Sequence, residues 1–147
     1  MTGSWLRIAS MCALVAGSLA YFRDPSWTAS ITSGMRAWEE DPPGTRFRWT
    51  AGRASFFVPA AASTMTLPMR AVFPGTNDRP VIVSVSVDER WLADVVLENP
   101  AAWVTTSLPL PRRHTPRRFR RIDLHVNRTV VGAFILGVMT GEIGLKY

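Results

Sequence analysis

The chain has 147 residues, of which 47% are hydrophobic and 19% are charged, which suits one domain with its own core and excludes a largely disordered chain. Lys and Arg number 17 against 11 Asp and Glu, and the net charge of +6 permits contact with phosphate, acidic glycans or anionic lipid. The charge also fits an ordinary surface on which arginine replaces lysine, because Lys146 is the one lysine. The single cysteine, Cys12, excludes an intrachain disulfide and a zinc site made of several cysteines.

Residues 1–23 are expected to be a signal peptide or a membrane anchor. The stretch Ile8–Phe22 contains no charged residue and lies between Arg7 and Arg23. As a helix it would span roughly 22 Å, which is short of a bilayer core of about 30 Å. Ser18-Leu19-Ala20 has the small-x-small form of a cleavage site, so a cleaved signal and a retained anchor both stay open. Either one would place the rest of the chain in the periplasm or outside the cytoplasmic membrane.

Residues 24–44 are predicted to form a short amphipathic helix and a linker. Asp24 is a suitable N-cap and Pro25 a suitable first helical residue. The large apolar side chains then follow at helical spacing, at Trp27, Ile31, Met35 and Trp38. This stripe is expected to pack on its own domain, and the alternative is that it lies on a membrane surface.

Residues 45–147 show the period of two that is typical of β-strands. Strands are predicted near 46–49, 64–71, 81–88, 91–98, 103–110, 122–126 and 143–147, separated by turns rich in Pro, Gly and Asn. Phe134–Met139 is apolar on both faces and is predicted to be a buried strand. The predicted fold class is all-β, an antiparallel jelly-roll-like β-sandwich preceded by a hydrophobic helix and a short amphipathic helix.

The segment Pro111–Arg128 is the most charged part of the chain. Ile122, Leu124 and Val126 form its inward row, and Phe119 is out of phase with them, which predicts a bulge near Arg120. The loop before this strand is either an ordinary solvated turn or a rim that binds a polyanion through Arg112, Arg113, Arg117 and Arg118. The outward face of the strand carries a polar row, Arg121, Asp123, His125 and Asn127.

Two stretches resemble a known group of domains. VSVDERWLADVVLENPAAWVTTSLPLP (Val83–Pro111) is similar to the strand–turn–strand pattern of galactose-binding-domain-like, carbohydrate-binding-module-like jelly-roll domains. RRIDLHVNRTVV and LGVMTGEIGL resemble the last strands of such domains, particularly those of bacterial envelope and glycosyltransferase-associated membrane proteins. The resemblance covers 46–147 and implies a jelly-roll fold. Asp88-Glu89-Arg90 stands where these domains usually have Asp-Gly, and no binding residue is transferred from them.

The sequence contains no motif that indicates catalysis, a cofactor or a metal. It lacks a Gly-rich phosphate loop, a G-x-S-x-G elbow and an H-E-x-x-H pair. Sugars are held by aromatic faces and by polar groups, and Trp91 could supply such a face, although it could equally belong to the core. The candidate ligand-binding residues are therefore Trp91, Arg121, Asp123, His125 and Asn127.

The sequence thus favours a non-catalytic, extracytoplasmic binding module of the bacterial envelope. Its expected partner is a glycan, an acidic envelope polymer or membrane glycosyltransferase machinery, and nucleic acid is not expected because the arginines are not interleaved with exposed aromatics. The alternative is a structural or assembly subunit that docks on a membrane-protein partner or on anionic lipid through its basic loop and helix.

Overall fold

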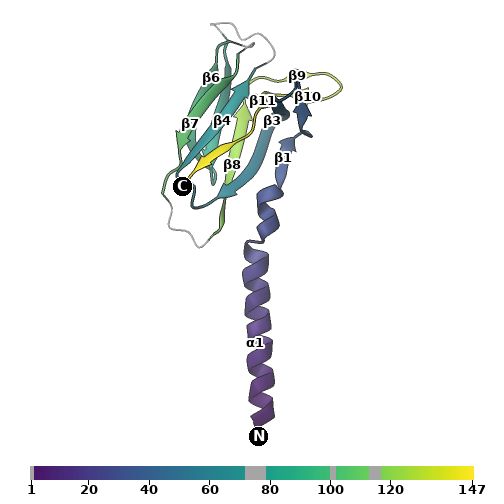
Figure 1. Ribbon diagram of the computed structural model, residues 1–147, viewed down its shortest axis with the longest axis vertical. Coiled ribbons are helices and arrows are strands. Elements are labelled where there is room, and N and C mark those ends of the chain that lie inside the picture. Colours follow the sequence, from purple (N-terminus) through teal and green to yellow (C-terminus); the bar gives the residue numbers. More distant parts are fainter. Residues whose placement is uncertain (1, 72–78, 100–101, 113–116) are drawn as a thin grey trace.

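The computed structural model describes residues 2–71, 79–99, 102–112 and 117–147. An N-terminal helix, α1 (Thr2–Arg23), projects from a β-sandwich (Figure 1). Its 22 residues span roughly 33 Å, more than the uncharged stretch alone and enough for a bilayer core of about 30 Å. Every described side chain from Trp5 to Arg23 is exposed. The apolar stretch Trp5–Ser30 is long enough to cross a membrane, and it also has the composition and position of a signal sequence.

The domain after α1 is almost entirely antiparallel β-structure. One layer has the order β1 (Thr32–Met35), β3 (Arg46–Pro59), β8 (Phe119–Val126), β5 (Val81–Val87) and β6 (Arg90–Leu97). In the other layer, β4 (Thr64–Arg70) pairs with β7 (Val104–Pro109) on one side and with β11 (Met139–Thr140) and β12 (Gly144–Lys146) on the other. The start of β3 also pairs with β11 and with β2 (Glu39–Glu40), so this long strand joins the two layers.

The core lies between the two layers and is made by the inward rows of their strands. The period of two produces these rows, because alternate side chains of a strand point to opposite faces. In β4, β5 and β8 they are Met65, Leu67 and Met69; Val81, Val83, Val85 and Val87; and Ile122, Leu124 and Val126, all at most 3% exposed. The predicted jelly-roll-like β-sandwich preceded by a hydrophobic helix is therefore the fold of this chain.

The predicted amphipathic helix after residue 24 is reduced to a 3-10 helix, η1 (Ser26–Ser30). The next residues form β1, because they gain ladder hydrogen bonds to β3, with Thr32 opposite Phe56 and Ser33 opposite Ser55. Gly34 has a φ of +63°, and a Cβ there would collide with the carbonyl oxygen of Arg53. Strand pairing therefore overrides the helical spacing. The expected apolar stripe is not buried as a face, and its tryptophans, Trp27 and Trp38, are exposed.

Two further expectations were wrong. Phe134–Met139 is not one buried strand: β10 (Ile135–Leu136) forms an exposed hairpin with β9 (Val130–Val131), and Phe134 is 59% exposed. The chain approaches β3 from Gly137 onward, where the N–H of Gly137 donates to the carbonyl of Thr50 and the N–H of Thr50 donates to the carbonyl of Val138. The bulge expected near Arg120 is also absent, since β8 pairs with β3 in continuous register and Arg120 continues the inward row at 3% exposure.

Candidate functional site

The outer face of the layer β1-β3-β8-β5-β6 carries a row of polar residues that crosses all five strands. The register aligns Ser33 with Ser55, Ser55 with Asp123, Asp123 with Ser86, and Ser86 with Trp91. Adjacent strands lie about 4.8 Å apart, so this row extends over roughly 19 Å. We call these five residues the central row. It ends in an aromatic side chain that is 67% exposed.

Polar residues also form a second row beside the central one. His125 of β8 lies opposite Arg53 of β3 on one side and opposite Ser84 of β5 on the other. Ser84 in turn lies opposite Asp94 of β6. The outer face therefore offers hydroxyl, carboxylate, imidazole and guanidinium groups at the regular spacing of a sheet.

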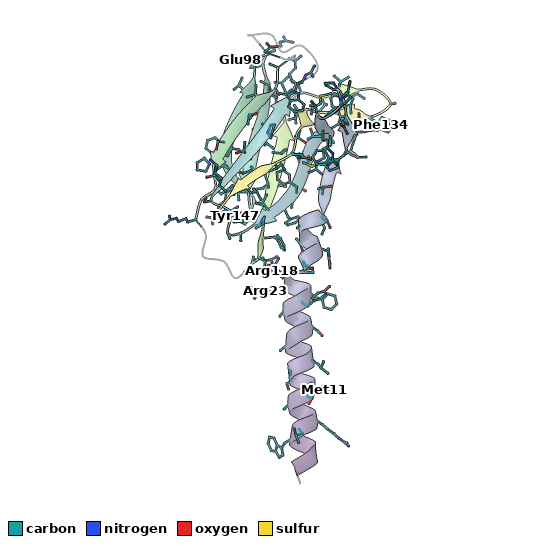
Figure 2. All side chains as sticks on the ribbon, viewed as in Figure 1. Met11, Arg23, Glu98, Arg118, Phe134 and Tyr147 are labelled. Carbon is teal, nitrogen blue, oxygen red and sulfur yellow. The ribbon has the colours of Figure 1, made fainter. Side chains whose placement is uncertain are left out.

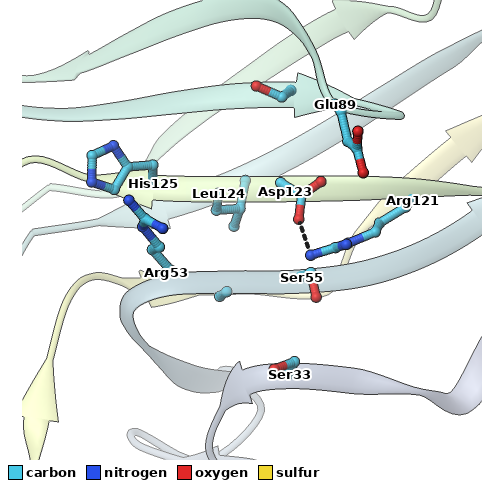
Figure 3. Close-up of a pocket in the computed structure, with 10 residues that line it drawn as sticks. Ser33, Arg53, Ser55, Glu89, Arg121, Asp123, Leu124 and His125 are labelled. Carbon is cyan, nitrogen blue, oxygen red and sulfur yellow. Dashed lines mark ion pairs between the residues drawn. The ribbon is translucent and has the colours of Figure 1, made fainter.

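The four polar residues of the central row, together with Arg53 and His125 of the second row, line an open groove of about 460 Å³ (Figure 3). Arg53 and His125 lie together toward one end, while Glu89, Asp123 and Arg121 lie toward the other. A volume in this range is common for ligand sites in proteins. The polar residues that line the groove are Ser33, Arg53, Ser55, Ser86, Glu89, Arg121, Asp123 and His125.

Trp91 reaches the outer face because of a β-bulge. The register between β5 and β6 shifts so that Val85 pairs with Ala93 while Ser86 pairs with Trp91, which leaves Leu92 as the extra residue. Leu92 then packs against the core, and Trp91 shares the outer face with Asp94.

The indole N–H of Trp91 donates to Oδ1 of Asp94 over 3.2 Å. Hydrogen bonds from Ser84 and from Trp91 lower the pKa of Asp94. Asp94 therefore fixes the orientation of the indole.

Three of the predicted binding residues lie in the groove. Arg121, Asp123 and His125 all line it, as the alternation along β8 predicted. Nη2 of Arg121 and Oδ1 of Asp123 form an ion pair of 2.7 Å. Both side chains are partly exposed, so the pair contributes at most about 1 kcal/mol to stability and is free to reorganise around a ligand.

The other predicted ligand residues are placed differently. Trp91 stands at the end of the central row and lines a smaller cavity with Asp88 and Arg112. Asn127 does not line the groove. Its Oδ1 accepts a hydrogen bond from the N–H of Ile82 and its Nδ2 donates to the carbonyl of Pro80, so Asn127 holds the start of β5.

None of the described rim residues lines the groove, and Arg112 lines the smaller cavity beside Trp91. The backbone N–H of Arg118 donates to Oδ2 of the buried Asp24 over 2.7 Å, which ties Arg118 to the end of α1 (Figure 2). The side chains of Arg112, Arg117 and Arg118 are exposed, and Arg113 lies outside the described residues.

The turn between β5 and β6 is held by a partly buried ion pair. Asp88 and Glu89 form the turn, with φ values of 50° and 67°, the left-handed region that favours glycine. Oδ2 of Asp88 accepts from Nε of Arg120 over 3.2 Å, and its Oδ1 accepts from the N–H of Arg121. Nη1 of Arg120 also donates to the carbonyl of Pro111. This network anchors the turn to β8 and so places Glu89 at the groove.

Sequence reasoning did not identify Ser33, Arg53, Ser55 or Glu89 as site residues. A usable pattern was present in β3, where Ala54, Phe56 and Val58 alternate with Arg53 and Ser55. Within the described residues, no group of three or more His, Cys, Asp and Glu side chains is placed to bind a metal ion.

No protein-family model matches this chain, and no curated protein matches its sequence. Among solved structures, the C-terminal domain of EclA, a sugar-binding protein, is similar with a TM-score of 0.51 and 18% identity, over 86% of this chain and 95% of that chain. A family 35 carbohydrate-binding module from an environmental isolate has a TM-score of 0.42 and 18% identity, over 77% and 91% of the two chains. The C-terminal family 6 module of LamC from Zobellia galactanivorans has a TM-score of 0.41 and 10% identity, over 77% and 90%. The likeness to the EclA domain shows that the jelly-roll-like fold is shared.

Proposed function

We propose that this chain is a non-catalytic glycan-binding module whose site is the groove on the outer face of β1-β3-β8-β5-β6. The observation that carries the proposal is the central row, in which four polar side chains lead across the sheet to an exposed tryptophan. An indole face packs against the C–H surface of a sugar ring, while carboxylate, guanidinium and hydroxyl groups bind its hydroxyls. The sugar-binding protein that shares the fold supports the same function.

The charges of the groove favour a neutral or weakly acidic glycan. Its basic residues are Arg53, Arg121 and His125, and its acidic residues are Glu89 and Asp123. Because Arg121 is paired with Asp123, the groove presents mixed rather than strongly positive charge. A strong polyanion would meet Glu89 and Asp123, whereas a chain of hydroxyl groups can use donors and acceptors of both signs.

The proposal also includes the setting of the module. In it, α1 tethers the domain to the cytoplasmic membrane of a bacterium, and the domain works on the extracytoplasmic side beside glycosyltransferase machinery. The length of α1 and its exposed apolar side chains support a membrane tether. The polar groove belongs to the sandwich and is not built from α1, so a tethered domain could still bind a glycan.

The test is a glycan array probed with the full chain in phosphatidylcholine nanodiscs, at low and at physiological salt. We expect binding that persists at physiological salt and that falls about tenfold in Trp91→Ala, since one lost stacking contact is worth about 1.4 kcal/mol. Trp27→Ala is the matched control, because Trp27 is 53% exposed and lies in η1, away from the groove. Equal losses in the two variants, or no binding to any glycan, would rule out this site.

A second candidate is docking on anionic lipid or a membrane-protein partner through the basic loop. It is favoured by the hydrogen bond between Arg118 and Asp24, which holds Arg118 near the end of α1. This role predicts no specific signal on the glycan array. It predicts instead binding to anionic lipid vesicles that fades with salt and is lost in Arg117→Ser/Arg118→Ser, while Trp91→Ala has no effect.

A further inference from the structure

A second groove, separate from the polar one, opens along the side of the sandwich. It has a volume of about 560 Å³ and lies between β1, at the edge of one layer, and the segment Glu142–Leu145 that enters β12, at the edge of the other. Ala29 and Ser30 of η1 line it as well. Figure 1 shows this short helix between α1 and β1, so the groove reaches the part of the domain that directly follows α1.

Seven of the residues that line this side groove are apolar, and the others are polar or charged: Ser30, Thr32, Arg48 and Glu142. Phe56 and Val58 of β3 are 3% and 2% exposed and reach the groove from the core. Ile143 and Leu145 are partly buried and approach it from the other layer. The layers are therefore not closed against each other along this side, and apolar side chains face the space between them.

The basic residue of this groove is Arg48. Among the described residues, Nε of Arg48 is the one buried side-chain polar atom that has no hydrogen-bond partner. The guanidinium carbon of Arg48 lies 4.7 Å from the centre of the Trp38 ring, and both residues line the groove. Burial lowers the pKa of Arg48. An anionic group in the groove would pair with the accessible part of this guanidinium through charge-assisted hydrogen bonds.

Glu142, the acidic residue that lines this groove, forms its ion pair with Arg46 and not with Arg48. Its Oε1 is 3.2 Å from Nη1 of Arg46, and its side chain is 67% exposed. The ligand that suits the groove therefore has one anionic group for Arg48 and an apolar body for the walls. The choice of a membrane lipid rests on the membrane tether proposed above, because an acyl chain that leaves a bilayer spanned by α1 would meet the η1 end of this groove first.

We propose that the side groove binds an anionic single-chain amphiphile, of the fatty-acid class, with its carboxylate at Arg48. The acyl chain lies along Phe56, Ile143 and Leu145 toward η1. This groove shares no lining residue with the polar groove, so the module would bind a membrane lipid and a glycan at two different surfaces.

The test uses the full chain reconstituted in phosphatidylcholine vesicles with a photoreactive palmitic acid that carries a mid-chain diazirine. After irradiation, peptide mapping gives the adducts on Ala29–Ser30 and Ile143–Leu145 relative to those on α1, which serves as the internal measure of general membrane labelling. We expect groove adducts that excess palmitic acid removes and that methyl palmitate, which lacks the charge, leaves in place. This competition in the wild-type chain requires no substitution.

The matched variants are Arg48→Gln and Arg90→Gln. We expect groove adducts to fall about tenfold in Arg48→Gln, because a charge-assisted hydrogen bond of about 1.5 kcal/mol is lost, and to stay unchanged in Arg90→Gln. Arg90 is exposed and lies on β6, at the opposite edge of its layer. Adducts confined to α1, or equal competition by acid and ester, would overturn the proposal, as would equal adducts in the two variants.

Discussion

Two neighbouring arginines on β8 show how differently the two faces of one sheet use the same side chain. Arg120 points inward, is 3% exposed, and is held by Asp88 and by the carbonyl of Pro111. Arg121 points outward, its side chain is 48% exposed, and it pairs with Asp123 in the groove. On the inner face the guanidinium is a structural cross-link, and on the outer face it remains available to a ligand.

The same contrast extends over the whole layer. The inner face is a continuous apolar surface in which Arg120 is the only buried arginine among the described residues, while the outer face of the same strands presents the central row. Stability and binding are therefore separable, because alternate residues of each strand serve one or the other. Substitutions on the two faces test this separation.

The largest expected effect is on the inner face. Arg120→Ala should lower the free energy of unfolding by about 3–5 kcal/mol, because it breaks the ion pair and hydrogen bond to Asp88 in a partly buried site. Arg121→Ala should change it by less than about 1 kcal/mol. Urea unfolding of the full chain in detergent micelles, followed by tryptophan fluorescence, measures both.

The pair Arg120→Met/Asp88→Asn sharpens this test. It removes both charges, and Asn tolerates the positive φ at residue 88. We expect the double variant to be more stable than Arg120→Met alone, because the two have the same packing and only the single variant keeps the carboxylate of Asp88 beside an apolar side chain. A double variant that is as unstable as Arg120→Met would mean that the ion pair does not account for the effect.

The next comparison sets Ile122 against Trp91. Ile122→Ala should cost about 2–5 kcal/mol of stability, because Ile122 is 0% exposed and its loss leaves a cavity, yet the folded variant should keep its glycan affinity. Trp91→Ala should cost less than about 1 kcal/mol of stability and lose about tenfold in affinity. Unfolding and glycan titration on the same samples distinguish them, and parallel losses in both quantities would contradict the separation of faces.

A smaller effect is expected at the turn that carries Glu89. Glu89→Gly should raise stability by about 0.5–1 kcal/mol, because it relieves the left-handed conformation of a non-glycine residue. Asp88→Gly is the matched control at the other positive φ. It should lower stability instead, since Asp88 accepts bonds from Arg120 and from the N–H of Arg121. Unfolding in urea gives both signs, and a destabilised Glu89→Gly would show that Glu89 is also structural.

Much of the sandwich could be predicted from the sequence, because the alternation in β4, β5 and β8 is regular. Arg121, Asp123 and His125 were placed on the outer face by the same rule, and they do line the groove. The rule failed at Arg120 because a charged residue in an inward row is stable only with a partner. That partner, Asp88, lies 32 residues away and meets it only in the folded sheet.

The rest of the site depends on pairing that no local pattern specifies. Ser33 joins the central row because β1, a four-residue strand containing Gly34, pairs with β3. Strict alternation would place Trp91 on the same face as Ala93 and Val95, and the bulge at Leu92 reverses it. In both places the register with a distant strand decides which side chains reach the groove.

The smallest expected effect is the pH response of the contact between Trp91 and Asp94. Hydrogen bonds from Ser84 and from Trp91 lower the pKa of Asp94 below its ordinary value of 3.8. The stability that follows is therefore complete above about pH 5 and is lost as the pH falls through the lowered pKa.

Trp91→Ala should raise the pKa of Asp94 only part of the way to 3.8, because the bond from Ser84 remains. Ser84→Ala should raise it further, because that bond is the larger cause. An NMR titration of the Asp94 carboxyl carbon measures both shifts. An unchanged pKa in Trp91→Ala would show that the indole is not held by Asp94, and the aromatic end of the central row would then lack a fixed orientation toward a sugar.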